Sequence, residues 1–237
     1  MSLCERFNIR LEYDNLWQSG QEALKMKGVA FDSELLPANL DKRKGLGLFF
    51  WQDRLVANTQ PVLKALHEQF PDQIILYSFP GSPARQHITL LEMVGPTQEY
   101  EDKYQDLEAK FQEVCRPIID QVPAVKANFT GIAATPSVIL LKGEPVDNTF
   151  NLFRERLREA IEKAGLPPLL RRKVTIFHTT LGRFVKPVED IDKLISLIRS
   201  FNSYRVGEDT FFDLQMIRAS WLMAESQVTT LANFRLK

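Results

Sequence analysis

The sequence contains one four-residue pattern twice, and the scarcity of histidine makes the repeat informative. Only three histidines occur among the 237 residues, and two of them begin the pattern histidine, any residue, threonine, leucine. The first copy is His87-Ile88-Thr89-Leu90 and the second is His178-Thr179-Thr180-Leu181. Both copies lie in apolar, β-rich stretches, so we expect each of them to form part of a strand.

The spacing within the pattern places the histidine and the threonine on one face of the strand. Successive side chains of a strand point to opposite faces, so His87 projects with Thr89, and His178 with Thr180. Each strand then presents an imidazole and a hydroxyl about 7 Å apart, at roughly 3.3 Å per residue. If both strands face one groove, two imidazoles and two hydroxyls meet there.

Such a set of side chains is suited to cleaving a phosphodiester without a metal ion. A neutral imidazole takes a proton from water or a hydroxyl group, and a protonated imidazole donates one to the leaving oxygen. Because the histidine pKa is about 6.5, both forms are accessible near neutral pH. We assign His87 as the general acid and His178 as the general base, with the reverse assignment open. Thr89 and Thr180 would bind the phosphate oxygens.

Strands and helices alternate twice in a similar order along most of the chain, which predicts an α+β fold built from a duplicated unit. The apolar patterns predict strands at 45–51, 73–79, 86–94, 125–133, 137–141 and 173–184, with a strand-rich stretch at 210–223. They predict helices at 58–70, 97–115, 150–164 and 188–201.

The first 43 residues differ from the rest in being polar and irregular. We predict that residues 1–43 are an N-terminal extension, with a short helix near 17–25, and that residues 44–237 form the two-lobed domain. The sequence leaves open whether the extension covers the groove.

Charge and composition exclude several classes of protein. Thirty basic and thirty acidic side chains cancel, which argues against a protein that coats long duplex DNA. No apolar run reaches the roughly 18 residues that span a bilayer. Cys4 and Cys115 provide neither a disulfide framework nor a metal cluster. We therefore expect a cytoplasmic protein with no membrane association, no metal and no cofactor, and with an undetermined oligomeric state.

From about Gly45 onwards, the chain resembles the two-histidine (2H) phosphoesterase superfamily, and within it the 2′-5′ RNA ligase and cyclic phosphodiesterase branch. The resemblance rests on Leu48-Phe49-Phe50, on the first histidine pattern with Val94-Gly95 after it, and on the helix at 150–164. It also rests on the segment from Phe177 to Phe184, which contains the second pattern.

The resemblance implies a bilobal fold, with two related lobes of antiparallel sheet, flanking helices and a central groove. It implies metal-independent chemistry on 2′,3′-cyclic phosphates, 1″,2″-cyclic phosphates, 2′-5′ linkages or RNA 3′ ends. It also implies that Arg183, five residues after the second histidine, contacts the substrate phosphate.

Three features depart from that family's pattern. Residues 1–43 have no counterpart in compact members, and Thr179 stands where an aliphatic residue is usual. Arg183 lies at an odd offset from His178, so a regular strand would turn it to the opposite face. It reaches the groove only if a β-bulge or a strand end lies nearby.

The functional prediction is a phosphoesterase, with a role in RNA processing, whose substrate is a nucleotide or an RNA terminus. The alternative is a non-catalytic protein that binds a nucleotide or RNA end in the same groove. A third hypothesis is that the histidine pair is accidental. Arg171-Arg172-Lys173 could attract a nucleic-acid backbone, and Tyr77, Phe79 or Phe184 could stack on a base, although a basic turn and core packing are the simpler interpretations.

Overall fold

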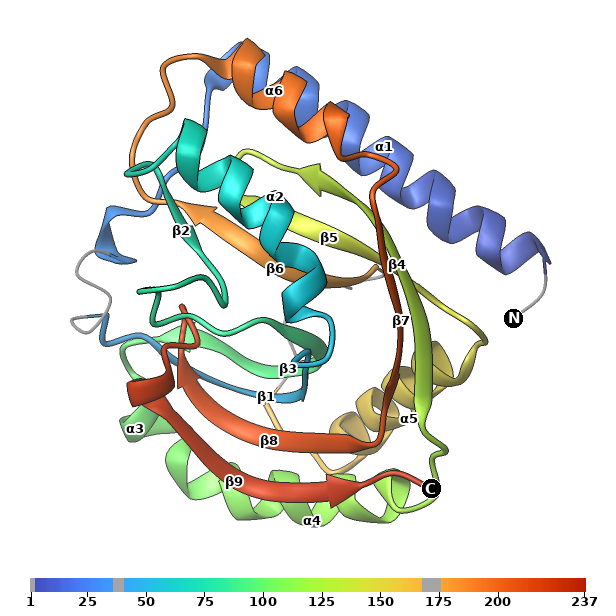
Figure 1. Ribbon diagram of the computed structural model, residues 1–237. Helices are drawn as coiled ribbons and strands as arrows, with labels where there is room; N and C mark the ends of the chain where they lie inside the picture. Colours follow the sequence, from blue (N-terminus) through green and yellow to red (C-terminus); the bar gives the residue numbers. More distant parts are fainter. Residues whose placement is uncertain (1–2, 36–40, 168–175) are drawn as a thin grey trace.

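Six helices and nine strands form in the part of the chain that the computed structural model describes, namely residues 3–35, 41–167 and 176–237 (Figure 1). The strands are β1 Lys44–Trp51, β2 Ile74–Leu76, β3 His87–Thr97, β4 Val125–Ala134, β5 Val138–Pro145, β6 Phe177–Phe184, β7 Arg205–Phe211, β8 Asp213–Ser220 and β9 Val228–Arg235. The helices are α1 Leu3–Lys27, α2 Val56–Gln69, α3 Tyr100–Lys103, α4 Glu108–Ile119, α5 Thr149–Lys163 and α6 Ile191–Ser200.

All the strands join one antiparallel sheet that divides into two lobes. The order is β7-β4-β5-β6-β3-β1-β8-β9, with the short β2 added to β6. The lobes meet where β3 lies beside β6, and there the register joins a single residue pair, Ile88 and Thr179. Helices α1, α2 and α6 lie beside the β4–β7 lobe, and α3, α4 and α5 lie beside the β1–β9 lobe (Figure 1). The predicted α+β architecture of two antiparallel lobes is confirmed.

Aromatic side chains from both lobes pack on the side of the sheet opposite the histidines. The ring of Phe211 in β7 lies 5.4 Å from that of Phe50 in β1 and 6.1 Å from that of Phe177 in β6. Ile88 and Leu181 are fully buried in the same core. Because close-packed interiors resist movement, the two motif strands are held rigidly from behind.

The N-terminal helix is longer than the sequence predicted, since α1 runs from Leu3 to Lys27 rather than near 17–25. Its buried residues Ile9, Tyr13 and Leu24 recur with helical spacing, but polar residues separate them, so the apolar stripe is narrow. Gly20 belongs to the same stripe, and a Cβ there would lie 2.2 Å from the carbonyl oxygen of Ala134. The helix therefore approaches the end of β4 at a point where only glycine fits.

Two other predictions differ from the structure. The single helix predicted at 97–115 is interrupted by a 3-10 turn at Gln105–Leu107 between α3 and α4, and this break allows the Tyr100 hydroxyl to donate to the Glu108 carboxylate at 2.9 Å. In a continuous helix, residues eight apart lie about 12 Å apart along the axis, at 1.5 Å per residue. Strand β9 was not predicted, and residues 173–175 of the strand predicted at 173–184 lie outside the described residues.

None of the helices in the described ranges is long and apolar enough to cross a membrane.

Candidate active site

One pocket between the two lobes contains every site residue that the sequence predicted. Its lining includes His87 and Thr89 from β3 and His178, Thr180 and Arg183 from β6. The two histidine patterns are 91 residues apart in sequence, and adjacent antiparallel strands bring them together. None of the described residues of the N-terminal extension lines this pocket.

The junction between β3 and β6 fixes how the two patterns face each other. Ile88 pairs with Thr179, so antiparallel register sets His87 near Thr180 and Thr89 near His178 on the pocket face. The Thr179 side chain points away from the pocket and is fully buried, and its hydroxyl donates to the His87 carbonyl at 2.7 Å. Threonine can therefore occupy position 179, where an aliphatic residue is usual, because its hydroxyl forms a hydrogen bond from β6 to β3.

A β-bulge in β6 turns Arg183 toward the pocket. Leu140 of β5 pairs with Thr180 and Ile139 pairs with Gly182, which leaves Leu181 as an extra residue. One extra residue reverses the alternation beyond it, so an odd offset from His178 returns to the pocket face. The bulge that the sequence required for Arg183 is present.

The first motif strand contains a matching bulge, which sequence reasoning missed. Leu48 of β1 pairs with Leu91 and Phe49 pairs with Thr89, so Leu90 is the extra residue. This brings Glu92 into the pocket lining. Two features shared by the patterns could have indicated this bulge, namely the leucine at the fourth position and a charged residue, Glu92 or Arg183, five positions after the histidine.

Aromatic rings surround the imidazole of His87. Phe49 lies 5.4 Å away in an edge contact, and Tyr77 and Trp51 lie 6.1 Å and 6.2 Å away between ring centroids. Burial lowers the pKa of His87 to about 4, the Arg85 carbonyl opposes this, and the Arg183 charge lowers it further. Nδ1 lies 2.9 Å from that carbonyl, which can only accept, so Nδ1 carries the proton and Nε2 is free for substrate.

The imidazole of His178 lies in a more electropositive environment than that of His87. Burial lowers the pKa of His178 to about 4, and the charges of His87, Arg154 and Arg183 act in the same direction. The Ile176 carbonyl opposes them, although His178 Nδ1 makes no hydrogen bond of ordinary geometry with the described residues. The lowered pKa values therefore favour the neutral form of both imidazoles near pH 7.

A buried arginine from α5 supports the bulge in β3. Arg154 is 4% exposed, its Nε donates to the Leu90 carbonyl at 2.8 Å, and its Nη2 donates to the Thr89 carbonyl at 3.3 Å. Its guanidinium also stacks on Phe150 at 4.3 Å. A bulge leaves backbone groups without strand partners, and Arg154 supplies partners at that point. No pattern in the sequence indicated this contact.

Arg183 is held in place by two aromatic side chains. Its Nε donates to the Tyr77 hydroxyl at 3.1 Å, and its guanidinium stacks on Trp221 at 4.2 Å. Tyr77 is buried in a small cluster with Leu35 of the extension, against which Trp221 also packs. The extension therefore contacts the residues that orient Arg183.

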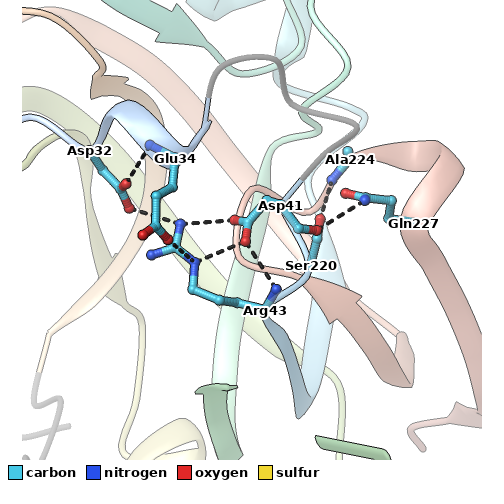
Figure 2. A network of polar contacts seen from close by, with 7 residues as sticks. All are labelled: Asp32, Glu34, Asp41, Arg43, Ser220, Ala224 and Gln227. Carbon is cyan, nitrogen blue, oxygen red and sulfur yellow. Dashed lines mark hydrogen bonds and ion pairs between the residues drawn. The ribbon is translucent and has the colours of Figure 1, made fainter. Parts of the chain in front are cut away.

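The extension also reaches the site at two other points. The Tyr13 hydroxyl in α1 accepts from Gly143 N–H at 3.1 Å and donates to the carbonyl of Phe177, the residue before His178. Figure 2 shows the second point, where the Arg43 guanidinium binds the Asp41 carboxylate through two 2.9 Å hydrogen bonds. The Asp41 carbonyl accepts from Gln227 in the β8–β9 connection, and Trp221 and Met223 of the same connection line the pocket.

The remaining candidate groups fall outside the site. In the described parts of the chain, no group of three or more histidine, cysteine or acidic side chains is arranged to hold a metal ion. Burial raises the pKa of the Cys115 thiol to about 12. Phe184 is buried and Phe79 packs on His67 at 4.9 Å, so core packing accounts for these two rings, whereas the buried Tyr77 contacts His87 and Arg183 rather than a base. The basic cluster at 171–173 lies outside the described residues.

Comparison with known proteins supports the fold. No protein-family model matches the sequence, and no curated protein matches it. TT0787 of Thermus thermophilus superposes with a TM-score of 0.55 at 17% identity, covering 82% of this chain and 97% of that one. E. coli LigT complexed with 3′-AMP gives 0.54 at 12% identity, covering 82% and 99%, and LigT complexed with NADP+ gives 0.52 at 11%, covering 82% and 98%. At these identities the likeness shows the fold, so the resemblance predicted from the sequence is confirmed for the fold alone.

Proposed function

We propose that the protein is a phosphoesterase that hydrolyses a 2′,3′-cyclic phosphate or a 2′-5′ phosphodiester at a nucleotide or RNA end, without a metal ion. The observation that supports this is the convergence of two imidazoles, two threonine hydroxyls and one guanidinium in a single pocket. The fold is shared with E. coli LigT, which is known in complex with 3′-AMP, with ATP and with phosphate.

The environments of the two imidazoles favour His87 as the acid and His178 as the base. Donation from Nδ1 to the Arg85 carbonyl stabilises the protonated ring of His87. The charge of Arg154 instead favours the neutral ring of His178. His178 would remove a proton from water as its oxygen bonds to phosphorus, while His87 gives its Nε2 proton to the departing ribose oxygen.

The remaining polar groups would bind the phosphate. The Thr89 and Thr180 hydroxyls and the Arg183 guanidinium would donate to the non-bridging oxygens, where negative charge builds up in the transition state. Substrate binding also favours the protonated form of His87, which is the form that acts as the acid. A phosphate anion beside two neutral imidazoles favours the protonation of one of them, so its arrival raises the pKa of His87 from about 4 toward neutrality.

Replacement of each histidine tests the proposal. His87→Ala and His178→Ala should each reduce hydrolysis of a 2′,3′-cyclic nucleotide by about 10²-fold or more, whereas His67→Ala on α2 should leave it unchanged. Circular dichroism and urea unfolding would establish that each variant is folded. Activity should persist in EDTA. Loss of activity in EDTA, or full activity in either pocket variant, would contradict the proposal.

The alternative of a non-catalytic binder is favoured by the burial of both imidazoles, which lowers their pKa values and opposes the protonated form that a general acid requires. A protein of this kind would bind nucleoside 2′- or 3′-monophosphates yet turn over no cyclic or 2′-5′-linked substrate between pH 5 and pH 8. Hydrolysis that disappears in His178→Ala would exclude it.

A further inference from the structure

Glu92 holds the position in the first motif strand that Arg183 holds in the second. Each lies five residues after the histidine of its pattern, and each follows a bulged leucine. Both line the pocket. The duplicated architecture has thus placed an acidic side chain and a basic side chain at related points of one site.

The two charged side chains are attached to the backbone at opposite ends of the pocket. Since β3 and β6 are antiparallel and pair at Ile88 and Thr179, moving along β3 from His87 to Glu92 leads away from Arg183. The histidines and threonines lie between these two ends. With the phosphate at the centre and its oxygens toward Arg183, the rest of the substrate has the Glu92 end available to it.

Arg183 and Glu92 differ in the hydrogen-bond and stacking partners that the protein provides for them. Arg183 is bound by Tyr77 and stacked on Trp221. Glu92 is half-buried, and it makes no hydrogen bond or ion pair with the described residues. Burial raises the pKa of the Glu92 carboxyl to about 7, against the opposing effect of the Arg183 charge. A half-buried carboxylate with a raised pKa and no protein donor is available to a bound ligand, whose N–H donors would stabilise its charged form.

The pocket wall near Glu92 is apolar, which suits contact with the face of a base. The pocket wall at this end comes from Leu46, Val94, Pro96 and Ala219, with Gly45 beside them. A Cβ on Gly45 would lie 2.8 Å from the Val94 carbonyl oxygen, so a side chain there would disturb this wall. Glu92 is about 7–10 Å from Thr89 at roughly 3.3 Å per residue, which is the span of one nucleoside.

We propose that Glu92 is a specificity-determining residue that accepts hydrogen bonds from the base of the phosphate-bearing nucleotide and selects guanine. Guanine alone among the four bases presents two adjacent N–H donors on its pairing edge, and a carboxylate has two oxygens to receive them. Uracil flanks its single donor with two carbonyls, which a carboxylate repels. This inference rests on the proposed function for the location of the phosphate.

Binding of nucleoside 3′-monophosphates tests the inference without any turnover. The wild-type protein should bind 3′-GMP about tenfold or more tightly than 3′-UMP, the discrimination typical of one bidentate contact. In Glu92→Gln the preference should disappear, through weaker 3′-GMP binding together with unchanged or tighter 3′-UMP binding, since the amide no longer repels the uracil carbonyls. Glu99→Gln is the matched control, because Glu99 is an exposed carboxylate just beyond the same strand.

Each outcome of this experiment bears on the inference. A guanine preference that persists in Glu92→Gln overturns it, as does equal weakening of 3′-GMP and 3′-UMP. Hydrolysis of all four 2′,3′-cyclic nucleotides without base preference overturns the role of Glu92 and leaves the enzyme intact. Base preference that is lost in Glu92→Gln, in a protein that hydrolyses nothing, supports the role of Glu92 and overturns the proposed enzyme.

Discussion

Replacement of Arg154 by methionine should affect both the stability of the fold and the pH dependence of catalysis. Methionine is similar in length but carries neither charge nor donors. The change removes the hydrogen bonds to the Leu90 and Thr89 carbonyls and the positive charge that lowers the pKa of His178.

The stability effect is the difference between two terms. Each buried carbonyl left without a donor costs about 1–3 kcal/mol. Part of this is offset because the variant no longer buries a guanidinium, whose pKa burial lowers to about 10. We expect a net loss of about 2–3 kcal/mol in the free energy of unfolding.

The kinetic effect has a definite sign. His178 must be neutral to act as a base, and the Arg154 charge favours that form. Without the charge the pKa of His178 rises, so the acid limb of kcat/KM should move to higher pH. Arg154→Lys keeps the charge and should preserve the position of the limb better than Arg154→Met.

Urea unfolding and the pH profile of kcat/KM on a 2′,3′-cyclic nucleotide measure the two effects. Arg156→Met is the matched control, since it removes a like charge from the same helix, where the exposed Arg156 side chain donates to the Gln121 side chain. An acid limb that does not move, or a stability loss no larger than that of Arg156→Met, would refute the role given to Arg154.

Three further predictions follow from the same geometry. Tyr77→Phe removes the acceptor for Arg183 Nε and should raise KM several-fold with a smaller decrease in kcat. Unchanged steady-state kinetics would mean that stacking on Trp221 alone holds the guanidinium in place. Deletion of Leu181 removes the bulge but also shortens the offset of Arg183 from His178 to four residues, so a regular strand keeps the guanidinium on the pocket face and the variant should retain more activity than Arg183→Ala; a loss as large as that of Arg183→Ala would contradict this register. The free energy of unfolding should fall between pH 6.5 and pH 4 by up to about 1.4 kcal/mol per pH unit for each pocket histidine, because the unfolded chain binds protons that the folded rings, with pKa values of about 4, do not. Urea unfolding at a series of pH values should show a smaller loss for the variant in which both pocket histidines are alanine. An equal slope in this variant and the wild type would contradict the lowered pKa values.

Local periodicity was sufficient to predict which side chains share the pocket face. The two-residue repeat of a strand puts His87 with Thr89 wherever that strand lies, and the same holds for His178 with Thr180. The odd offset of Arg183 even required a bulge, which is present at Leu181. These inferences needed only neighbours in sequence.

Features that depend on distant contacts were missed for a physical reason. Glu92 reaches the pocket because of register against β1, and Arg154 binds the bulge from a helix 64 residues further along the chain. Neither contact leaves a periodic signal. The length of α1 was also missed, since it packs through a narrow stripe that includes Gly20, and glycine indicates a helix breaker when its neighbour is unknown.

The most direct test of two imidazoles acting on one phosphate is ¹⁵N NMR of the histidine side chains during titration with 3′-AMP. The chain has only three histidines, and His67 serves as an internal reference outside the pocket. The two pocket rings should both shift at one shared saturation point, and the pKa of one should rise from about 4 toward neutrality while His67 is unchanged. A ligand that binds and perturbs only one pocket ring, or neither, would contradict the shared site.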